Sequence, residues 1–319
     1  MAKITLTSLL FLLIAQFSQA QINHSEYQVY TISDTETYTY KKPKIYDIVT
    51  CLPKDLGNVL SDMIQTENLM ALGTATFATT ALIPADQTLL DNARSLGERI
   101  GLNDTNRYKN FGPLSNIPSD ISSGIYLIGN GTTPILLSMG FATYGLINND
   151  YRSLNTATGL IESLAVSGVF SQSIKRITGR ESPTPAIENG NPGGAWRPFP
   201  SFAEYGKNTP SYDAMPSGHL MTATAALYVI SGNYPEVQWI KPVGFVLIGV
   251  LSYEMVQSRV HWVSDYPIAL VMGYLIGKNI AQSKIKKSNT ESNEIKKYKL
   301  NFSASRTFGY NIIGARLSF

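Results

Sequence analysis

The chain has 319 residues, of which 44% are hydrophobic and 15% are charged, and its formal net charge is +3. This length suffices for one large or two ordinary domains with a buried core. The small net charge, without a dense Lys/Arg tract interleaved with aromatic residues outside the C-terminal region, argues against nucleic acid as a partner. The single cysteine, Cys51, excludes an internal disulfide.

The first 20 residues carry one early lysine, an apolar run and the small-residue ending Ser18-Gln19-Ala20. This pattern predicts a secretory signal peptide over residues 1–20, cleaved before Gln21. An uncleaved membrane anchor is the alternative, although the apolar run is shorter than a membrane span. We therefore expect an exported chain in the periplasm or at the cell envelope, with an integral membrane location as the alternative.

Residues 21–50 are rich in Tyr and Thr and alternate locally, as in YQVYTIS and TYTY. The alternation predicts two short strands around Ser33-Asp34-Thr35. Residues 51–283 then contain six apolar segments of helical length, separated by Gly, Pro, Asn and Asp. These segments are Leu69–Ile83, Pro134–Ile147, Ala157–Ile174, His219–Ile230, Pro242–Val256 and Tyr266–Ile280.

A membrane span needs about 20 apolar residues. The segments above are shorter and are interrupted by Thr, Ser, Glu162 or Lys241. They therefore favour a helical bundle buried in its own core over membrane-spanning helices. Residues 184–212, rich in Pro, Gly, Asn and Ser, predict a long functional loop.

The C-terminal region changes character. Residues 284–299 are polar and Lys-rich and predict a linker, and residues 300–319 alternate as a β-hairpin that could pair with the N-terminal strands. An aromatic last residue, Phe319, is also typical of outer-membrane barrel chains, but one hairpin cannot close a barrel. The overall expectation is a mainly α fold with short terminal β-strands.

The run Pro216-Ser217-Gly218-His219 stands directly before an apolar helical segment. Pro and Ser suit the first positions of a helix, whose unpaired N–H groups and positive dipole end bind anions. Gly218 lets a ligand approach the backbone, and His219 can protonate a leaving oxygen. The alternative is an ordinary capped helix start with a surface histidine.

A second motif is Ser258-Arg-Val-His-Trp-Val-Ser-Asp265. Its His261 and Asp265 are four residues apart, which predicts that they share one face of a helix. A carboxylate on one ring nitrogen would leave the other free to attack, and Arg259 offers donors for phosphate oxygens. A surface ion pair of His261 with Asp265 is the alternative.

A third, basic motif lies upstream. The helical segment from Ala157 is expected to stop at Gly179, with Lys175 in its last turn and Arg180 at the start of the following loop. Both side chains could bind one anion, or could complement the helix dipole. Two of the three histidines of the chain fall inside the two later motifs, which favours a functional site.

The order of these three motifs resembles the type 2 phosphatidic acid phosphatase/vanadium haloperoxidase superfamily, in its phosphatase branch. The resemblance covers about residues 69–282 and implies a helical bundle of that type. Two departures are visible. The arginine of the family's first motif, separated from the lysine by six residues and followed by a proline, is here Ser182, with Arg180 or Arg197 as substitutes. The family has five residues between the arginine and histidine of its third motif, and only Val260 stands between Arg259 and His261.

The resemblance implies a metal-independent phosphatase that acts on phosphomonoesters or lipid phosphates. In that scheme His261 forms a phosphohistidine, Asp265 orients it, and His219 protonates the leaving alcohol and activates water. Lys175, Arg180 and Arg259, with the Ser217 hydroxyl and the Gly218 N–H, hold the phosphate oxygens. No cofactor is implied, although vanadate could occupy the phosphate site, and association with a membrane surface is compatible with a lipid substrate.

Two other functions remain open from the sequence. A vanadate-dependent haloperoxidase would use the same pocket, and a non-catalytic envelope scaffold or anion-binding protein would explain the missing arginine and the terminal strands. The aromatic residues of the long loop are expected to pack that loop down rather than to form a lipid or aryl phosphate approach. These residues are Trp196, Phe199, Phe202, Tyr205 and Tyr212.

Overall fold

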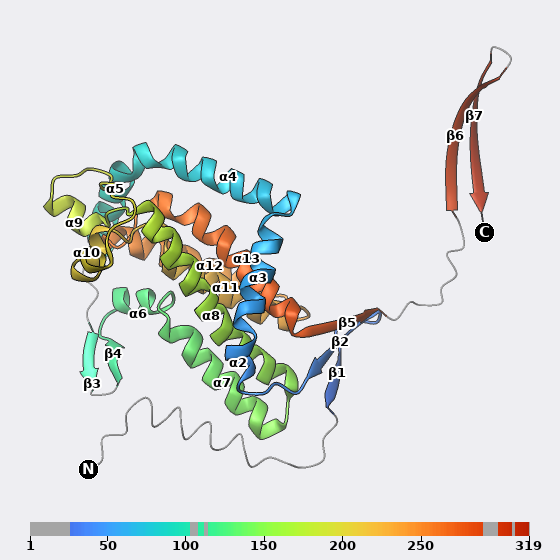
Figure 1. Cartoon of the computed structure of the whole chain (residues 1–319), viewed down its shortest axis with the longest axis horizontal. Coiled ribbons are helices and arrows are strands. Elements are labelled where there is room, and N and C mark those ends of the chain that lie inside the picture. The colour runs from blue at the N-terminus through green and yellow to red at the C-terminus, as the bar shows by residue number, and fades with distance from the viewer. Residues whose placement is uncertain (1–25, 103–107, 112–113, 290–298, 308–309, 319) are drawn as a thin grey trace.

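The computed structural model describes residues 26–102, 108–111, 114–289, 299–307 and 310–318. Most of these residues are helical, which confirms the prediction of a mainly α fold (Figure 1). The long helices are α3 (Leu52–Met63), α4 (Thr66–Leu82), α5 (Asp86–Arg99), α7 (Thr132–Asn148), α8 (Tyr151–Thr178), α11 (Gly218–Asn233), α12 (Ile240–Gln257) and α13 (Tyr266–Ser283). Short helices are α2 (Asp47–Thr50), α6 (Ile121–Leu127), α9 (Pro183–Glu188), α10 (Phe202–Lys207) and the 3₁₀ turns Ile83–Ala85, Thr209–Ser211 and Val263–Asp265.

All six predicted apolar segments form helices, namely α4, α7, α8, α11, α12 and α13. Helices α3 and α5 were not predicted, because both carry too many polar residues to stand out as apolar runs. The expected loop over residues 184–212 is only partly irregular, since α9 and α10 begin at Pro183 and after the capping residue Ser201.

Helices α8, α11 and α13 form the centre of the bundle (Figure 1). The face of α13 that carries Gly273 and Gly277 lies directly on α11. A Cβ atom at these glycines would come within 2.5 Å of the Met221 carbonyl oxygen and 2.4 Å of the Ala225 carbonyl oxygen. Only glycine permits this approach, which holds the two motif-bearing helices in close contact.

The N-terminal extension forms the predicted strands β1 (Tyr27–Thr31) and β2 (Glu36–Lys41), which pair antiparallel. The sheet has a third strand, β5 (Ile285–Asn289), which pairs with β2 at the start of the expected polar linker. The C-terminal hairpin β6 (Lys299–Thr307) and β7 (Tyr310–Ser318) pairs with itself, so β5 takes the place beside β2 that the sequence suggested for the hairpin. Strands β3 (Tyr108–Phe111) and β4 (Leu114–Pro118) form a separate pair. The predicted signal peptide lies outside the described residues.

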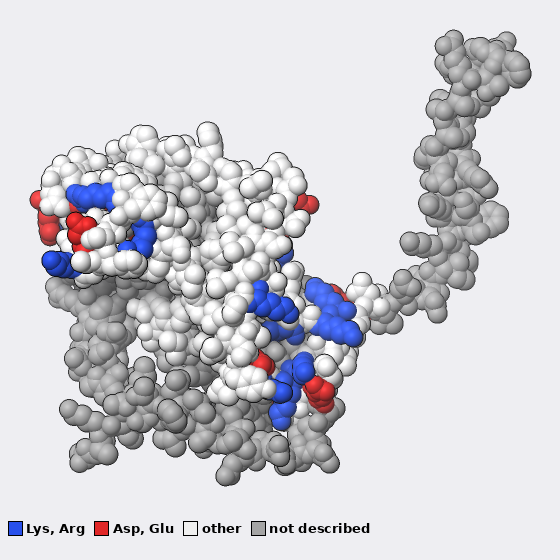
Figure 2. Space-filling view, viewed as in Figure 1, with Lys and Arg blue, Asp and Glu red and all other residues white. Residues whose placement is uncertain are grey.

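The outer helices expose much apolar surface. Phe77 on α4, Ile147 on α7 and Val246 on α12 are 74%, 77% and 65% exposed. In Figure 2 the charged side chains gather at two ends of the body, with an uncharged surface between them. The prediction of a bundle buried in its own core therefore holds for α8, α11 and α13, but not for the outer faces of α4, α7 and α12.

Candidate active site

The Pro-Ser-Gly-His run does start a helix. Ser217 has an extended backbone and caps α11, its hydroxyl accepting a hydrogen bond from the Leu220 N–H at 3.4 Å. Gly218 is the first helical residue and faces the end of α8. A Cβ atom at Gly218 would lie 3.1 Å from Ser171 Oγ and 3.8 Å from Lys175 Nζ. The N-terminus of α11 and the Lys175 ammonium group are therefore neighbours, and we call the place where they meet the anion site.

Both motif histidines lie at the anion site. The rings of His219 and His261 are 5.8 Å apart, edge to face, although the two residues come from different motifs. The ring of Tyr126 packs against the other side of His219 at 4.6 Å. His261 is buried, whereas His219 is partly accessible. The fold thus places one buried and one partly accessible imidazole next to each other, edge to face.

His261 lies close to Asp265, but not on a shared helical face. The two residues are joined by the 3₁₀ turn Val263–Asp265, and α13 begins only at Tyr266. His261 Nδ1 lies 3.4 Å from one Asp265 oxygen, which also accepts the Trp262 N–H at 2.8 Å. The prediction of a helical i,i+4 pair was wrong in its geometry, because the turn rather than a helix brings the side chains together.

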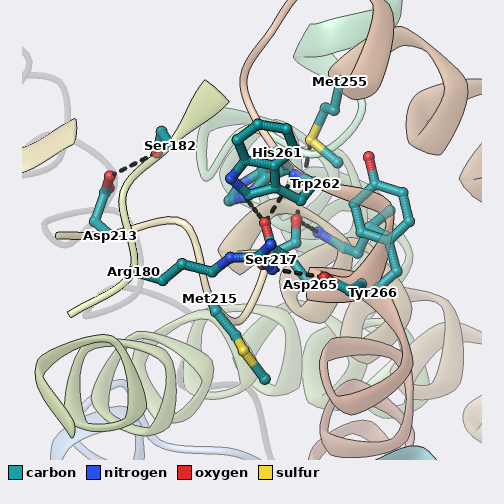
Figure 3. A network of polar contacts seen from close by, with 12 residues as sticks. Arg180, Ser182, Asp213, Met215, Ser217, Met255, His261, Trp262, Asp265 and Tyr266 are labelled. Carbon is teal, nitrogen blue, oxygen red and sulfur yellow. Dashed lines mark hydrogen bonds and ion pairs between the residues drawn. The ribbon is translucent and has the colours of Figure 1, made fainter. Parts of the chain in front are cut away.

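Arg180 is buried below this pair and does not border the anion site through an exposed guanidinium. It donates to the second oxygen of Asp265 at 2.7 Å (Figure 3). It also donates to Ser264, to the Gly193 carbonyl oxygen and to Asp86. Its side chain is fully buried, as are both carboxylates. The geometry assigns Arg180 to holding Asp265, in contrast to the expected phosphate contact.

Asp86, at the start of α5, was missed by sequence reasoning. Its carboxylate accepts from the Ser264 N–H and hydroxyl as well as from Arg180. A lone aspartate after a Pro-Ala pair carries no signal of this role in the sequence. The tertiary fold makes Asp86 the second anchor of the turn that carries Asp265.

Lys175 lies in the last turn of α8, which ends at Gly179 in a left-handed conformation, as predicted. Its ammonium group is 3.3 Å from Asp213, whose other oxygen accepts from the Ser182 hydroxyl at 3.3 Å. Figure 3 shows Ser182 and Asp213 facing one another. The family's arginine position is therefore occupied by Ser182, whose hydroxyl donates a hydrogen bond to the Asp213 carboxylate.

The second family arginine position also lacks a cation here. Six residues before His261 stands Met255, whose sulfur lies 4.0 Å from the Ser217 hydroxyl and whose carbonyl oxygen accepts the His261 N–H at 3.1 Å. Arg259 follows α12 with a left-handed backbone, φ 61°, and its carbonyl oxygen accepts from Thr184. Arg259 thus belongs to the turn before His261, not to a helix that starts there.

Arg197, the other candidate substitute, pairs with the buried Glu181 at 3.2 Å. Burial favours a raised pKa for Glu181, but donors from Asn191, Asn189, the Ala195 N–H and Arg197 together lower it. The loop residues thereby fold around one ionised carboxylate. Among its aromatic residues Tyr205 is buried and Phe202 is exposed, with both rings near the Arg176 guanidinium.

The surroundings of His219 favour its neutral form. Burial, followed by the nearby His261 and Lys175, lowers the pKa of His219 well below its ordinary value. A bound anion would oppose both charge effects and raise this pKa. His219 is therefore suited to gain a proton when phosphate binds. Among the described residues no group of three or more His, Cys, Asp or Glu side chains could hold a metal ion.

An apolar groove starts next to the histidines. Gly129 touches His219, since a Cβ atom at Gly129 would lie 2.8 Å from the His219 Cβ. The neighbouring Ile128 lines a groove of about 470 Å³ that continues along α11 between α7 and α12 as far as Tyr234 and Trp239. Its wall is almost entirely hydrocarbon and aromatic.

Comparison with known proteins agrees with the motif order. A family model described as the PAP2 superfamily matches residues 156–287, which contain the motifs from Lys175 to Asp265. The crystal structure of a transmembrane PAP2-type phosphatidylglycerolphosphate phosphatase from Bacillus subtilis is similar over 75% of this chain and 94% of that chain, with 14% sequence identity and a TM-score of 0.37. No curated protein sequence matches. Residues 156–287 thus match the PAP2 superfamily.

Proposed function

We propose that this protein hydrolyses a lipid phosphate through a phosphohistidine intermediate, with His261 as nucleophile and His219 as general acid and base. The observation that carries the proposal is the 5.8 Å distance between the two rings at the N-terminus of α11. Rings at that centroid separation are in edge contact, so a phosphate would lie beside them, against the N-terminus of α11, and not between them. Such a displacement requires one imidazole as nucleophile and one as proton donor at the same phosphorus atom.

The first step would use the ring nitrogen of His261 that faces away from Asp265. Nδ1 is oriented by Asp265, so Nε2 attacks phosphorus while the P–O bond to the alcohol breaks. His219 gives its proton to that oxygen. Lys175 and the N–H groups of Gly218 and its helix neighbours stabilise the charge on the phosphate oxygens.

The second step restores the enzyme. Water attacks the phosphohistidine, neutral His219 takes a proton from this water, and the P–N bond to His261 breaks. Arg180 and Asp86 keep Asp265 in place throughout, because their contacts are buried and do not involve the substrate. Ser217 contributes by capping α11. Phosphate leaves and His219 is again protonated for the next cycle.

The groove beside His219 supports a lipid substrate. It begins within two residues of Tyr126, which packs on His219, and its apolar lining would accept an acyl chain. A chain laid along α11 from Ala223 to Tyr234 would leave its phosphate at the anion site. The exposed apolar faces of α4, α7 and α12 support placement of the bundle in a bilayer, where such a substrate resides.

The lengths of the apolar helices also support placement in a bilayer. Helix α12 is long and apolar enough to cross a membrane, and α6 with α7, bent by 67°, would form a second span. The site and the β1–β2–β5 sheet lie at opposite ends of the bundle (Figure 1) and would face opposite sides of the membrane. Export directed by residues 1–20 remains part of the proposal. The first check of the bilayer placement is whether the chain stays in the membrane fraction after a carbonate wash. Release into the wash would contradict the bilayer placement.

The activity test uses the full chain in detergent with p-nitrophenyl phosphate and a phosphatidic acid, each with and without chelator. We expect turnover that survives the chelator, and a loss of at least about 10⁴-fold in His261→Ala. His24→Ala is the matched control, since it removes a histidine outside both motifs. No turnover of any phosphoester would favour the scaffold alternative, and halide oxidation that needs vanadate and peroxide would favour the haloperoxidase.

A further inference from the structure

The anion site is unusually poor in positive charge. Its buried cation is Lys175, and Arg180 lies beneath it. Three carboxylates are in direct contact with them, namely Asp86, Asp213 and Asp265. With both imidazoles neutral, this set has one more negative than positive charge. Even when Arg259 is counted, the charges only balance, so a dianion would meet little net attraction.

Asp213 is the carboxylate that bears directly on a ligand. Asp86 and Asp265 are held by Arg180 below the site, whereas Asp213 lies on Lys175, the cation closest to Gly218. Its side chain is 25% exposed, compared with 0% for the other two. A phosphate bound to Lys175 would therefore lie within a few ångströms of a partly solvated negative charge.

The neighbours of Asp213 do not neutralise it further. Lys175 comes from α8, and Ser182 supplies a neutral hydroxyl where the family has a cation. The backbone of Arg180 forms a bridge with Asp213, but its guanidinium is committed to other carboxylates. Burial, and after it the negative charge of Asp213, raises the pKa of Tyr205 on α10.

From these contacts we infer that Asp213 is a specificity-determining residue, which makes the anion site select a singly charged phosphoryl group. The inference rests on the proposed function and narrows its substrate. Two ligands share this chemistry, a phosphomonoester that keeps one proton and a phosphodiester. For either ligand the bond that breaks is the P–O bond to the leaving alcohol, as in the mechanism above.

Binding is tested with inorganic phosphate, which is mainly singly charged at pH 5.5 and mainly doubly charged at pH 8. Dimethyl phosphate, singly charged at both values, corrects for titration of His219. In thermal-shift titrations of the detergent-purified full chain, we expect wild type to bind phosphate about tenfold more weakly at pH 8 after that correction. Asp213→Asn should recover this factor at pH 8 and change dimethyl phosphate binding less.

Ser182→Arg is the second variant, in case Asp213→Asn does not fold. It places a cation beside the intact Asp213 and should likewise improve binding of the dianion, whereas Ser182→Ala should not. Unchanged pH dependence in both charge variants, with phosphate binding intact, would overturn the charge selection alone. Absence of phosphate binding at every pH would remove the anion site itself, and with it the proposed function.

Turnover separates the two sources of a single charge. At pH 8 the wild-type chain should hydrolyse bis(p-nitrophenyl) phosphate faster than p-nitrophenyl phosphate if the natural substrate is a diester. A protonated monoester as substrate predicts the reverse order at pH 5.5, with an acidic optimum. In either case Asp213→Asn should shift the ratio of the two kcat/KM values toward the monoester at pH 8, by about tenfold. An unshifted ratio would contradict the role of Asp213.

Discussion

Two buried clusters of charged residues, one at each end of the bundle, contain similar ion pairs but have different roles. At the site end Arg180 joins Asp265, at 2.7 Å, to Asp86. Near the sheet Lys284 joins Glu162 at 2.8 Å and ties the end of α13 to α8. Both clusters link elements that are far apart in sequence, and both have side chains with little or no exposure.

The difference lies in what each cluster touches next. Asp265 also contacts the His261 imidazole, so the first cluster fixes the orientation of that ring. Lys284 directly precedes β5, so the second cluster fixes where the sheet begins. A buried ion pair therefore says little about function until its next contact is known.

The largest expected effect on turnover comes from the loss of His219, which belongs to neither cluster. His219→Ala should lower kcat by about 10²- to 10⁴-fold, because general acids contribute that much, and should leave the melting temperature nearly unchanged. Stopped-flow or steady-state turnover of p-nitrophenyl phosphate measures the first and calorimetry the second. A variant that loses stability rather than rate would place His219 among the supporting residues.

The same histidine predicts a pH profile. The lowered pKa of His219 means that the free enzyme holds the required proton only under acidic conditions. The value of kcat/KM should therefore fall as pH rises through that pKa, whereas kcat should fall at a higher pH because bound phosphate raises it. In His219→Ala this alkaline limb should disappear, and its persistence would assign the limb to another group.

Breaking the site-end cluster should affect stability and rate together. Arg180→Met leaves two buried carboxylates without their cation, which should cost about 3–5 kcal/mol of the free energy of unfolding. The fraction that remains folded should also turn over more slowly, since Asp265 loses the donor that positions it. Denaturant unfolding and activity per folded molecule report the two effects. Full activity per folded molecule would separate Arg180 from the catalytic turn.

Breaking the sheet-end cluster should affect stability alone. Lys284→Met leaves Glu162 buried without its partner and should cost about 3–5 kcal/mol, with kcat/KM per folded molecule unchanged. The double variant Glu162→Gln with Lys284→Met should recover part of the loss, because no unpaired charge remains. A drop in kcat/KM in the single variant would mean that the sheet communicates with the site.

The smallest effect concerns the helix that carries His219. Ser217→Ala removes the hydroxyl that caps α11 and should cost about 1 kcal/mol. Because the hydrogen bond to Leu220 is long, at 3.4 Å, the lower part of the usual range is expected. A shift in melting temperature without a change in KM for phosphate esters is the expected result, and a large rise in KM would make the hydroxyl a ligand.

Periodicity and local signals were sufficient for several elements. The apolar runs predicted α4, α7, α8, α11, α12 and α13, because long hydrophobic segments form helices whether or not their partners are known. The stop at Gly179 and the cap at Ser217 followed from backbone preferences that act within a few residues. The three-motif order likewise pointed to the PAP2 superfamily.

The sequence by itself determined the helices, their ends and the residue types that gather in the motifs, because these depend on neighbours within one or two turns. Only the tertiary structure decided that Asp86 anchors the turn that carries Asp265, that Arg180 lies beneath Asp265, and that Asp213 pairs with Lys175. These assignments depend on which residues, up to 178 positions apart, are brought together and shielded from water. A charged side chain carries no local mark of the partner that burial will give it, so its role is fixed only when the helices pack.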